Sequence, residues 1–334
     1  LKKEQPISFS IKATENLFKD SKFDFISGRR KFYLFSGIII VAGLVSMFTR
    51  GFSLGVDFQG GRSYFVAFDK DVNTNDVRNV LSEEFGAAPE VKTIGLNQNE
   101  VKITTSYKID DTSAEVENEV SRRLNNGLKK VSANYEIKDA QKVGPTIAND
   151  IKVSAIYSVI FSILIIFVYI LIRFRRWQFG VSAIVALLHD VLVLLAIFSL
   201  LNGFVPFSMD IDQAFIAAVL TVMGYSINDT VVVFDRVREY VDERKSKNED
   251  LPTIINNALN STLSRTVVTG ICTIAVLLVI FLFGGETLRG FSFAMLIGVV
   301  FGTYSSLFVA TPFVVEMIKN KEEDKPAPAK AELS

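Results

Sequence analysis

The sequence contains few of the residues from which many functional sites are built. Cysteine and histidine occur once each, as Cys272 and His189, so no disulfide can form within the chain and a zinc site of histidine and cysteine ligands is excluded. Lysine and arginine, 36 together, balance 36 acidic residues, and this zero formal charge gives no basic surface for nucleic acid. No Walker-type phosphate loop occurs, nor do the Tyr-Asp and Gly-x-Gly-Asp settings of intramembrane aspartyl proteases. We therefore expect no cofactor, no metal site and no enzymatic activity.

Charged residues are absent from six long stretches, which are 32–49, 153–172, 191–209, 213–228, 266–285 and 290–315. About 20 apolar residues cross the ~30 Å hydrocarbon core of a bilayer. The sequence thus predicts an α-helical polytopic membrane protein whose six transmembrane helices lie at about 32–50, 153–172, 179–201, 213–234, 266–283 and 291–316.

The segment 51–150 has the composition of a soluble domain. Alternating apolar residues predict strands at 62–68, 90–96, 101–106 and 135–143, and helical periodicity predicts helices at 74–85 and 113–130. Asn73 or Thr74 is a suitable cap for the first of these helices. The order βαββαβ is that of the α+β ferredoxin-like sandwich.

Basic residues in the connections orient the chain, because cytoplasmic loops are rich in lysine and arginine. Four clusters agree on one side: 29–31, 173–176, 236–247 and 319–321. The connection 202–212 holds two acids and no base. We therefore expect segment 1–31 and the polar, disordered tail 318–334 on the cytoplasmic side, the domain 51–150 outside, and five spans within 151–317.

The cytoplasmic connection 235–265 contains a helical pattern after Pro252. Its apolar residues recur at helical spacing, as Ile254, Ile255, Ala258, Leu259 and Leu263. Two placements fit this pattern: an amphipathic helix along the membrane surface, or a helix packed on the ends of the bundle.

Several polar residues fall inside the predicted spans, where an ionisable group costs roughly 2.5–3.5 kcal/mol on insertion scales. His189 and Asp190 lie midway along the third span, and Asp229 lies about 9 Å before the helix end at Asp235. The neighbours of Asp229 and the polar residues of span five are Tyr225, Ser226, Asn228, Thr230, Arg265, Thr266, Thr269 and Thr273. A carboxylate that alternates between an apolar setting and contact with a guanidinium can take up and release a proton.

Purely structural roles also fit these polar residues. The intramembrane polar groups could form a fixed network that joins helices, at about 0.6 kcal/mol per hydrogen bond. Asp235, next to Arg236 and Arg238, fits a solvated helix end. Gly298 and Gly302 form a small-xxx-small face, which favours close helix packing.

Short strings along nearly the whole chain resemble the SecF family, the smaller half of the SecD/SecF protein-export complex, within the resistance-nodulation-division (RND) superfamily. The strings are Phe23-Asp24-Phe25, Arg29-Arg30-Lys31, Gly55-Val56-Asp57-Phe58-Gln59-Gly60-Gly61, Val143-Gly144-Pro145, Ala186-Leu187-Leu188-His189-Asp190, 224–236 with Gly224-Tyr225-Ser226-Ile227-Asn228-Asp229-Thr230 at its start, Ser264-Arg265-Thr266, Arg289-Gly290-Phe291 and Gly302-Thr303-Tyr304-Ser305-Ser306. Gln59, where threonine is usual, and Cys272, in a threonine-rich helix, are small departures.

The resemblance implies an RND-type bundle in the bacterial inner membrane that uses the proton motive force to promote preprotein translocation. It implies a proton path through Asp229 and Arg265, with Asn228 and Thr230 beside them. His189, Asp190, Tyr225, Ser226 and Thr269 are possible accessory residues. The implied partners are SecD, the SecYEG channel, YajC, an unfolded preprotein and membrane lipid, with no nucleic acid.

Two other functions stay open at this point: an RND-type efflux half-transporter for small molecules, and a structural assembly subunit without transport. The leading Leu1 and polar leader suggest the SecF half of a fused SecDF chain, or a standalone SecF with its start trimmed.

Overall fold

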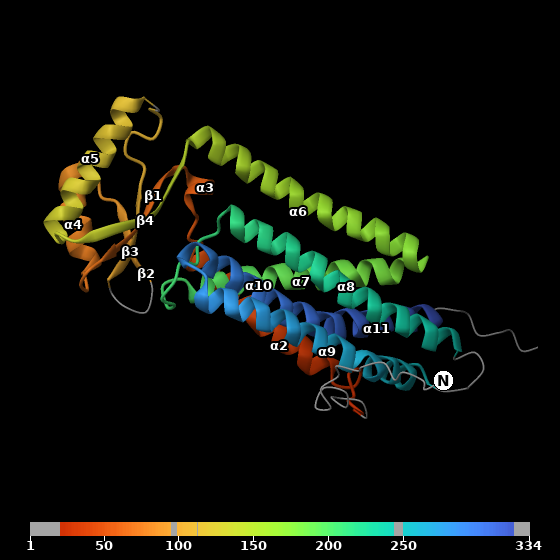
Figure 1. Cartoon of the computed structure of the whole chain (residues 1–334). Coiled ribbons are helices and arrows are strands. Elements are labelled where there is room, and N and C mark those ends of the chain that lie inside the picture. The colour runs from red at the N-terminus through yellow and green to blue at the C-terminus, as the bar shows by residue number, and fades with distance from the viewer. Residues whose placement is uncertain (1–20, 95–98, 112, 244–249, 324–334) are drawn as a thin grey trace, which may run out of the picture.

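The computed structural model describes residues 21–94, 99–111, 113–243 and 250–323. A small α+β unit lies at one end of a long helical bundle, and the start of helix α2 lies at the opposite end (Figure 1). Six helices within the described residues are long and apolar enough to cross a membrane. The fold class predicted from the sequence is thereby confirmed.

The α+β unit contains the strands β1 (Gly61–Phe68), β2 (Glu90–Ile94), β3 (Glu100–Thr105) and β4 (Tyr135–Val143) and the helices α4 (Thr74–Phe85) and α5 (Ala114–Val131). The sheet is antiparallel with the order β2-β3-β1-β4, which is the ferredoxin-like arrangement. The Asn73 side chain accepts a hydrogen bond from Asn75 N and caps α4.

Both helices of the unit cover the same face of the sheet. Val66 on β1 and Ile103 on β3 are buried there with Leu81 of α4 and Leu124 of α5. Because successive strand residues point to opposite faces, Phe65 and Lys102 point to the other face, toward the bundle.

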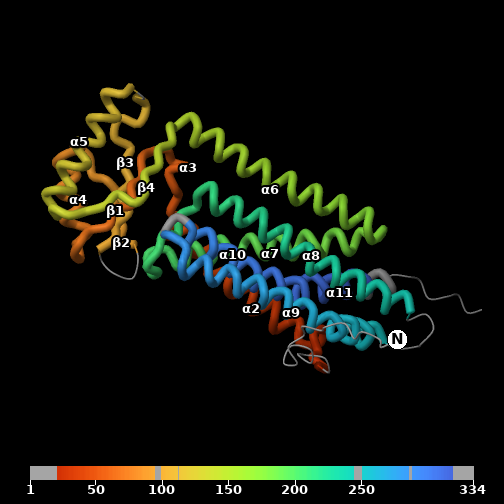
Figure 2. The backbone as a smooth tube through the Cα atoms, viewed as in Figure 1, coloured from red at the N-terminus to blue at the C-terminus, as the bar shows by residue number. Residues whose placement is uncertain are grey.

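The bundle consists of α2 (Arg29–Arg50), α6 (Pro145–Phe174), α7 (Trp177–Leu201), α8 (Gln213–Glu243), α9 (Leu251–Phe283) and a last span built from α10 (Glu286–Ser305), the π-helical turn η2 (Ser306–Ala310) and α11 (Thr311–Glu323). The helices run alongside one another away from the α+β unit (Figure 2). The spans of α7, α8 and α10 to α11 are the most buried, whereas α2, α6 and α9 expose most of their apolar residues.

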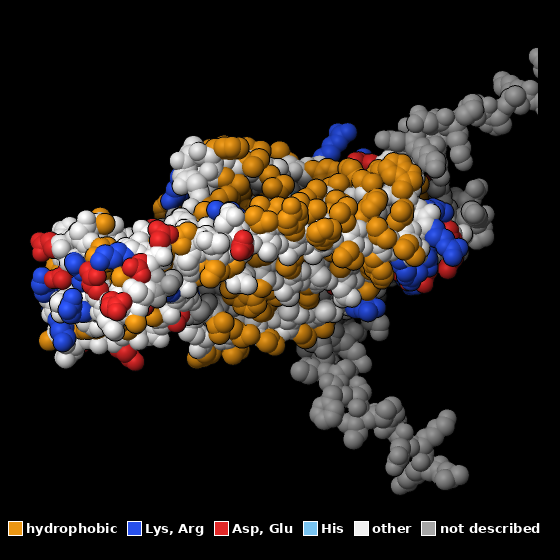
Figure 3. Space-filling view, turned by 90° about the horizontal axis from the view of Figure 1, so that it is seen from above, with side chains coloured by type: hydrophobic (Ala, Val, Ile, Leu, Met, Phe, Trp, Pro, Cys, Tyr) orange, Lys and Arg blue, Asp and Glu red, His pale blue; other side chains and the backbone are white. Residues whose placement is uncertain are grey.

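Hydrophobic side chains cover the visible face of the bundle, and charged side chains gather at its two ends (Figure 3). This distribution suits a lipid-facing belt between two aqueous regions.

The helices extend beyond the charge-free stretches that predicted them. Helix α6 already begins at Pro145, and Asp150 and Lys152 are exposed on its first turns. Polar residues at exposed helix positions outside the hydrocarbon cost little, so charge alone does not end a helix.

The connection 235–265 differs most from the sequence-based prediction. Helix α8 continues to Glu243, and the pattern after Pro252 belongs to the start of α9, which runs unbroken to Phe283. A separate helix along the membrane surface is therefore wrong. Ile255 and Leu259 are buried in one hydrophobic cluster with Phe25 and Val314, as expected for a helix packed on the bundle ends. Residues 244–249 and most of the predicted disordered tail lie outside the described residues.

The chain before β1 and the α7–α8 connection meet where the α+β unit joins the bundle. The short helix α3 (Val56–Gln59) leads into β1, and Gly60 and the first strand residue, Gly61, have φ values of 75° and 137°, which suit glycine alone. Leu54 forms a parallel β-bridge with Ile211 of the α7–α8 connection. The Ile211 amide donates to Ser53 O at 2.7 Å, and the Gly55 amide donates to Ile211 O at 2.9 Å.

Candidate functional site

Asp229 lies in the interior of the bundle, on the part of α8 that faces α10. Its side chain is buried and the residue is 4% exposed. The Thr303 hydroxyl on α10 donates to its Oδ2 at 3.2 Å. Among the described residues, no lysine or arginine nitrogen lies within 4.0 Å of this carboxylate. Asp229 is thus a buried carboxyl group held by a neutral hydroxyl donor.

Helix α10 reaches Asp229 because glycines let it approach α8 closely. A Cβ added at Gly298 would lie 2.1 Å from Val222 Cγ2, and one at Gly302 would lie 3.0 Å from Ser226 Cβ. The small-xxx-small face therefore packs against α8, which brings Thr303 to the carboxylate.

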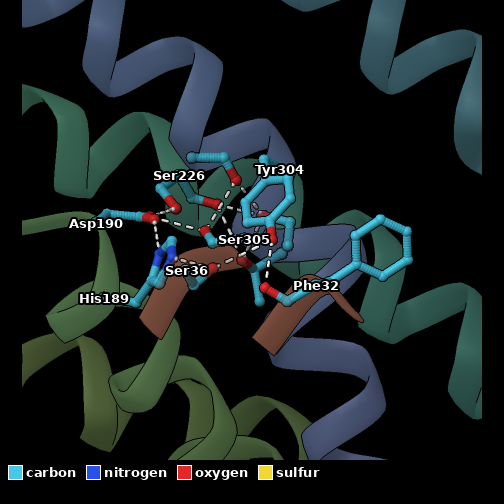
Figure 4. A network of polar contacts seen from close by, with 10 residues as sticks. Phe32, Ser36, His189, Asp190, Ser226, Tyr304 and Ser305 are labelled. Atoms are coloured by element: carbon cyan, nitrogen blue, oxygen red, sulfur yellow. Dashed lines mark hydrogen bonds and ion pairs between the residues drawn. The ribbon is translucent and has the colours of Figure 1, made fainter. Parts of the chain in front are cut away.

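A second buried carboxylate, Asp190 on α7, organises a larger network (Figure 4). Its Oδ2 accepts hydrogen bonds from Ser226 Oγ on α8 at 2.6 Å and from Ser305 Oγ on α10 at 2.9 Å. Its Oδ1 lies 3.0 Å from His189 Nδ1. Asp190 is 1% exposed, so polar contacts with three neighbouring side chains take the place of hydrogen bonds to water.

The network continues from His189 into α2. His189 Nε2 lies 2.9 Å from Ser36 Oγ, which lies 3.1 Å from the Tyr304 hydroxyl. Tyr304 in turn donates to the carbonyl oxygen of Phe32 at 2.9 Å. Four helices thus meet in one chain of hydrogen bonds.

The turn that follows Ser305 at the end of α10 is not α-helical. Ser306–Ala310 forms a π-helix, and the Thr311 hydroxyl bonds to Ser306 O, five residues earlier, at 3.0 Å. Ser306 Oγ lies 2.8 Å from Thr230 Oγ1. Wide turns of this type are frequent at functional sites.

The remaining predicted site residues are distributed around Asp229. Ser226 and Thr230 are buried on α8 and take part in the contacts above, and Tyr225 is half-buried beside them. Asn228, Arg265 and Thr269 are exposed, and no ion pair within 4.0 Å joins Arg265 to Asp229 in this described part of the bundle. Arg265 instead lines a pocket of about 390 Å³ between α8 and α9, with Asp235, Arg236, Glu239 and Ser261 among its other lining residues.

Sequence reasoning missed the hydroxyl donors on the facing helices, which are Ser36, Thr303, Tyr304, Ser305 and Ser306. All but Ser36 occur in a string that carries the family resemblance. Serine and threonine are common in membrane helices, and nothing in their spacing indicates which of them point at a carboxylate.

A third acidic group lies outside the spans, where the α+β unit meets the bundle. Asp210 forms ion pairs with Lys102 on β3 and, at 3.6 Å, with Lys92 on β2, and Ser53 donates to it as well. Burial opposes ionisation of Asp210, but the two lysines outweigh it and hold its pKa below the usual range. This cluster fixes the α7–α8 connection to the sheet.

Comparison with known proteins decides the family. Residues 123–320 match the family described as "Protein export membrane protein SecD/SecF, C-terminal", and residues 45–72, which include Gly60 and Gly61, match the "SecD/SecF GG Motif". Over 303 residues, the chain is 45% identical to the protein translocase subunit SecF of Rhodothermus marinus, covering 90% of this chain and 95% of that protein. The chain belongs to the SecF family. The Haemophilus influenzae SecF is 34% identical over 310 residues, which cover 93% of this chain and 90% of that protein.

Solved structures agree with this assignment. The crystal structure of SecDF from Thermus thermophilus, whose title calls it a translocon-associated membrane protein, is 29% identical with a TM-score of 0.76 over 91% of this chain. SecDF in a super-membrane-facing form gives a TM-score of 0.63 at 28% identity. The present SecF-family chain spans 40% of the solved SecDF chain. The chain is thus a multi-pass membrane protein with the role of a protein translocase subunit, which is a transport role.

Proposed function

We propose that this chain is the SecF part of a SecD/SecF complex that uses the proton motive force to promote preprotein translocation, and that Asp229 carries the proton. The observation that supports this most is the setting of Asp229, a buried carboxyl group in the interior of the bundle whose donor is the Thr303 hydroxyl. Within the part of the chain that the structure describes, no lysine or arginine nitrogen lies within 4.0 Å of it. A buried charge without a partner is costly, so such a group exchanges a proton when its surroundings change.

Arg265 is the group that would change those surroundings. It lines the pocket between α8 and α9 together with Asp235 and Arg236, which belong to the basic end of the bundle. A shift of α9 that brings the guanidinium to Asp229 would favour the carboxylate and release the proton, and withdrawal would favour uptake. In this proposal water would reach α8 through this pocket, whose lining includes Val231, two residues beyond Asp229.

Movement in the bundle would reach the α+β unit through the connection before α8. Asp57 Oδ2 accepts a hydrogen bond from Gln213 N at the first residue of α8, at 2.9 Å, and Asp210 binds Lys102 of the sheet. A displacement of α8 would therefore be passed to the α+β unit, where an emerging preprotein would be handled.

The orientation proposed from the basic clusters places both termini in the cytoplasm and the α+β unit in the periplasm, with the bundle in the bacterial inner membrane. The exposed apolar faces of α6 and α9 leave room for lipid and for a SecD-like half, fused or separate. SecYEG, YajC and the unfolded preprotein are the further partners of this proposal.

The test is the exchange Asp229→Asn, assayed as late-stage preprotein translocation into inverted vesicles with and without an uncoupler. Asparagine keeps the shape and the hydrogen bond to Thr303 but cannot exchange a proton. The uncoupler-sensitive enhancement should be lost, while the amount of inserted, SecD-bound protein is unchanged. A purely structural assembly subunit would tolerate this change.

Asp235→Asn is the matched control. This carboxylate lies on the part of α8 beyond the charge-free stretch and is partly exposed, and it pairs with Arg173 and Arg238 at 3.0 Å. Ion pairs that solvent reaches contribute about 0–1 kcal/mol. The uncoupler-sensitive enhancement of translocation in Asp235→Asn should be close to that of the unaltered chain. Full enhancement in Asp229→Asn would refute the proton-carrying role.

A further inference from the structure

The only histidine of the chain lies beside a buried aspartate, and the hydrogen bonds around the two have a fixed direction. The chain of contacts runs from Asp190 through His189, Ser36 and Tyr304 and ends at the carbonyl oxygen of Phe32 (Figure 4). A carbonyl oxygen can only accept a hydrogen bond. The end of the chain therefore decides the direction of every bond before it.

Working back from Phe32 fixes each proton in turn. Tyr304 has one hydroxyl proton, which it donates to Phe32 O, so it must accept from Ser36. Ser36 also has one hydroxyl proton, which it donates to Tyr304, so it must accept from the ring of His189. His189 therefore carries a proton on Nε2.

The other ring nitrogen then has two possible states. If Nδ1 is also protonated, His189 is an imidazolium ion that donates to the Asp190 carboxylate. If Nδ1 is bare, it is an acceptor at 3.0 Å from Asp190 Oδ1, and only a proton on that oxygen makes the contact a hydrogen bond. A bare nitrogen facing an ionised oxygen would place two lone pairs together.

We propose that His189 and Asp190 hold one exchangeable proton between Nδ1 and Oδ1, and so form a second proton-binding site inside the membrane, separate from Asp229. The two states differ only in which atom the proton is bound to. In both, the pair has no net charge, which agrees with its burial and with the lack of any lysine or arginine nitrogen within 4.0 Å of Asp190 among the described residues.

The surroundings of the pair contain few other ionisable groups. The elements packed against it contribute Tyr33 on α2, Tyr225 and Asp229 on α8, and Tyr304 on α10, whereas the lysine and arginine residues of these helices lie at their ends. Ser226 and Ser305 donate to Asp190 and are close in sequence to Asp229 and Thr303. The His189–Asp190 pair and Asp229 are thus neighbouring sites whose carboxylates accept hydrogen bonds from different hydroxyl groups.

The single histidine makes the proposal directly measurable. The full chain, labelled with ¹⁵N-histidine and placed in lipid nanodiscs, gives ring nitrogen signals from His189 alone, and these distinguish protonated from bare nitrogens. Infrared spectra of the unaltered chain and of Asp190→Asn, compared as a difference, show whether Asp190 has a carboxylic acid C=O band.

Two results support the proposal: both ring nitrogens protonated, or Nε2 protonated with a C=O band that Asp190→Asn removes. Two results overturn it: a bare Nε2, or a protonated Nε2 with a bare Nδ1 and no such band. The measurement requires no transport. A failure of Asp229 to carry protons would therefore leave these signals unchanged and is distinguishable from a failure of this proposal.

A pair of variants tests the direction of the chain. Tyr304→Phe removes the acceptor of the Ser36 proton, so Ser36 is free to donate to the ring and the Nε2 signal should shift toward the bare form. Tyr157→Phe, on the exposed face of α6, is the matched control and should leave both signals in place. Identical spectra for the two variants would refute the assigned direction.

Discussion

At the scale of single residues, the two buried carboxylates have different partners. Asp190 accepts from two serines and lies against His189, whereas Asp229 accepts from one threonine. Fewer donors leave a carboxylate more responsive to a change in its surroundings. Asp229 is therefore the one that an approaching guanidinium affects most.

Arg265 can be tested by its charge and by its shape. Arg265→Ala should abolish the uncoupler-sensitive part of translocation, because the Asp229 carboxylate then loses the guanidinium that would favour its charged form. Arg265→Lys should keep a partial enhancement, because lysine supplies the charge without the planar fork. The readout is translocation into inverted vesicles with and without an uncoupler.

Arg236→Ala is the control for Arg265, since Arg236 lines the same pocket but pairs with Glu239 at 2.7 Å. The uncoupler-sensitive enhancement in Arg236→Ala should equal that of the unaltered chain within experimental error. Equal losses in Arg236→Ala and Arg265→Ala would point to the pocket's overall charge instead of the specific guanidinium.

At the scale of helices, the contact between α8 and α10 depends on a glycine. Gly298→Ala would place a methyl group 2.1 Å from Val222 Cγ2, and overpacking of this kind costs about 1–3 kcal/mol. The thermal unfolding midpoint in nanodiscs should fall. The added exchange Val222→Ala should recover part of the loss, because it removes the two methyl groups that the new Cβ would meet.

Gly224→Ala is the matched helical control. It lies on α8 with no atom within 4 Å of an added Cβ, and alanine is the better helix former. The thermal unfolding midpoint of Gly224→Ala should be unchanged or higher. A fall as large as that of Gly298→Ala would mean that glycine acts through backbone flexibility and not through close packing.

The contact between the sheet and the α7–α8 connection is also an element-scale feature, and it depends on pH in a defined direction. Burial raises the pKa of Asp210, but Lys102 and Lys92 outweigh burial and hold this pKa below its usual value of 3.8. A group with a depressed folded pKa stabilises the folded state above its unfolded pKa, and this stabilisation is lost as the pH falls through the folded value. The stabilisation by this contact should therefore be constant from neutral pH down to mildly acid pH and decrease progressively as the pH falls below 3.8.

Asp210→Asn removes this dependence and should weaken the contact at neutral pH, whereas at the lowest pH the variant and the unaltered chain should become alike. The measurement is the spread of distances between spin labels on α5 and on α7. Lys102→Gln should widen the distribution more than Lys92→Gln, since Lys102 is the more buried of the two. Equal widening of the distance distribution by the two variants would mean that the burial of each lysine does not affect how strongly it holds the contact.

At the scale of the whole molecule, the proposed orientation predicts which surfaces are accessible from outside. In a Cys272→Ala background, a cysteine at Ser121 on exposed α5 should react with an impermeant thiol reagent in intact spheroplasts. A cysteine at Thr253, exposed near the start of α9, should react only after lysis. The reverse pattern would contradict the orientation and the place of the α+β unit at the translocation exit.

Much of this architecture could be predicted from local sequence patterns. The alternation in 62–68 and 135–143, and the cap at Asn73, are short-range signals, and β1, β4 and α4 lie where these signals place them. The strings around Asp229 and Asp190 likewise mark carboxylates in apolar surroundings.

The partners of those carboxylates could not be predicted in the same way. Whether Thr303 or Ser305 faces Asp229 depends on how closely α10 approaches α8 and how the helix turns at Ser306–Ala310. These are properties of packing between distant segments. The same applies to Ser36, which is more than 150 residues from His189 in sequence.

The π-helical turn affects how the last span depends on its length. Such a turn holds an additional residue, and each α-helical residue rotates the chain by about 100°. Because the wide turn already absorbs that residue, deletion of one residue within Ser306–Ala310 would let α10 and α11 join as one regular helix without turning the later side chains. Glu316 would still reach Arg29, with which it pairs at 2.6 Å, and Val314 would stay buried. The deletion would instead remove the local contacts of the turn, such as that between Ser306 and Thr230, so we expect the rest of the span to tolerate it and the polar contacts beside Asp229 to be lost.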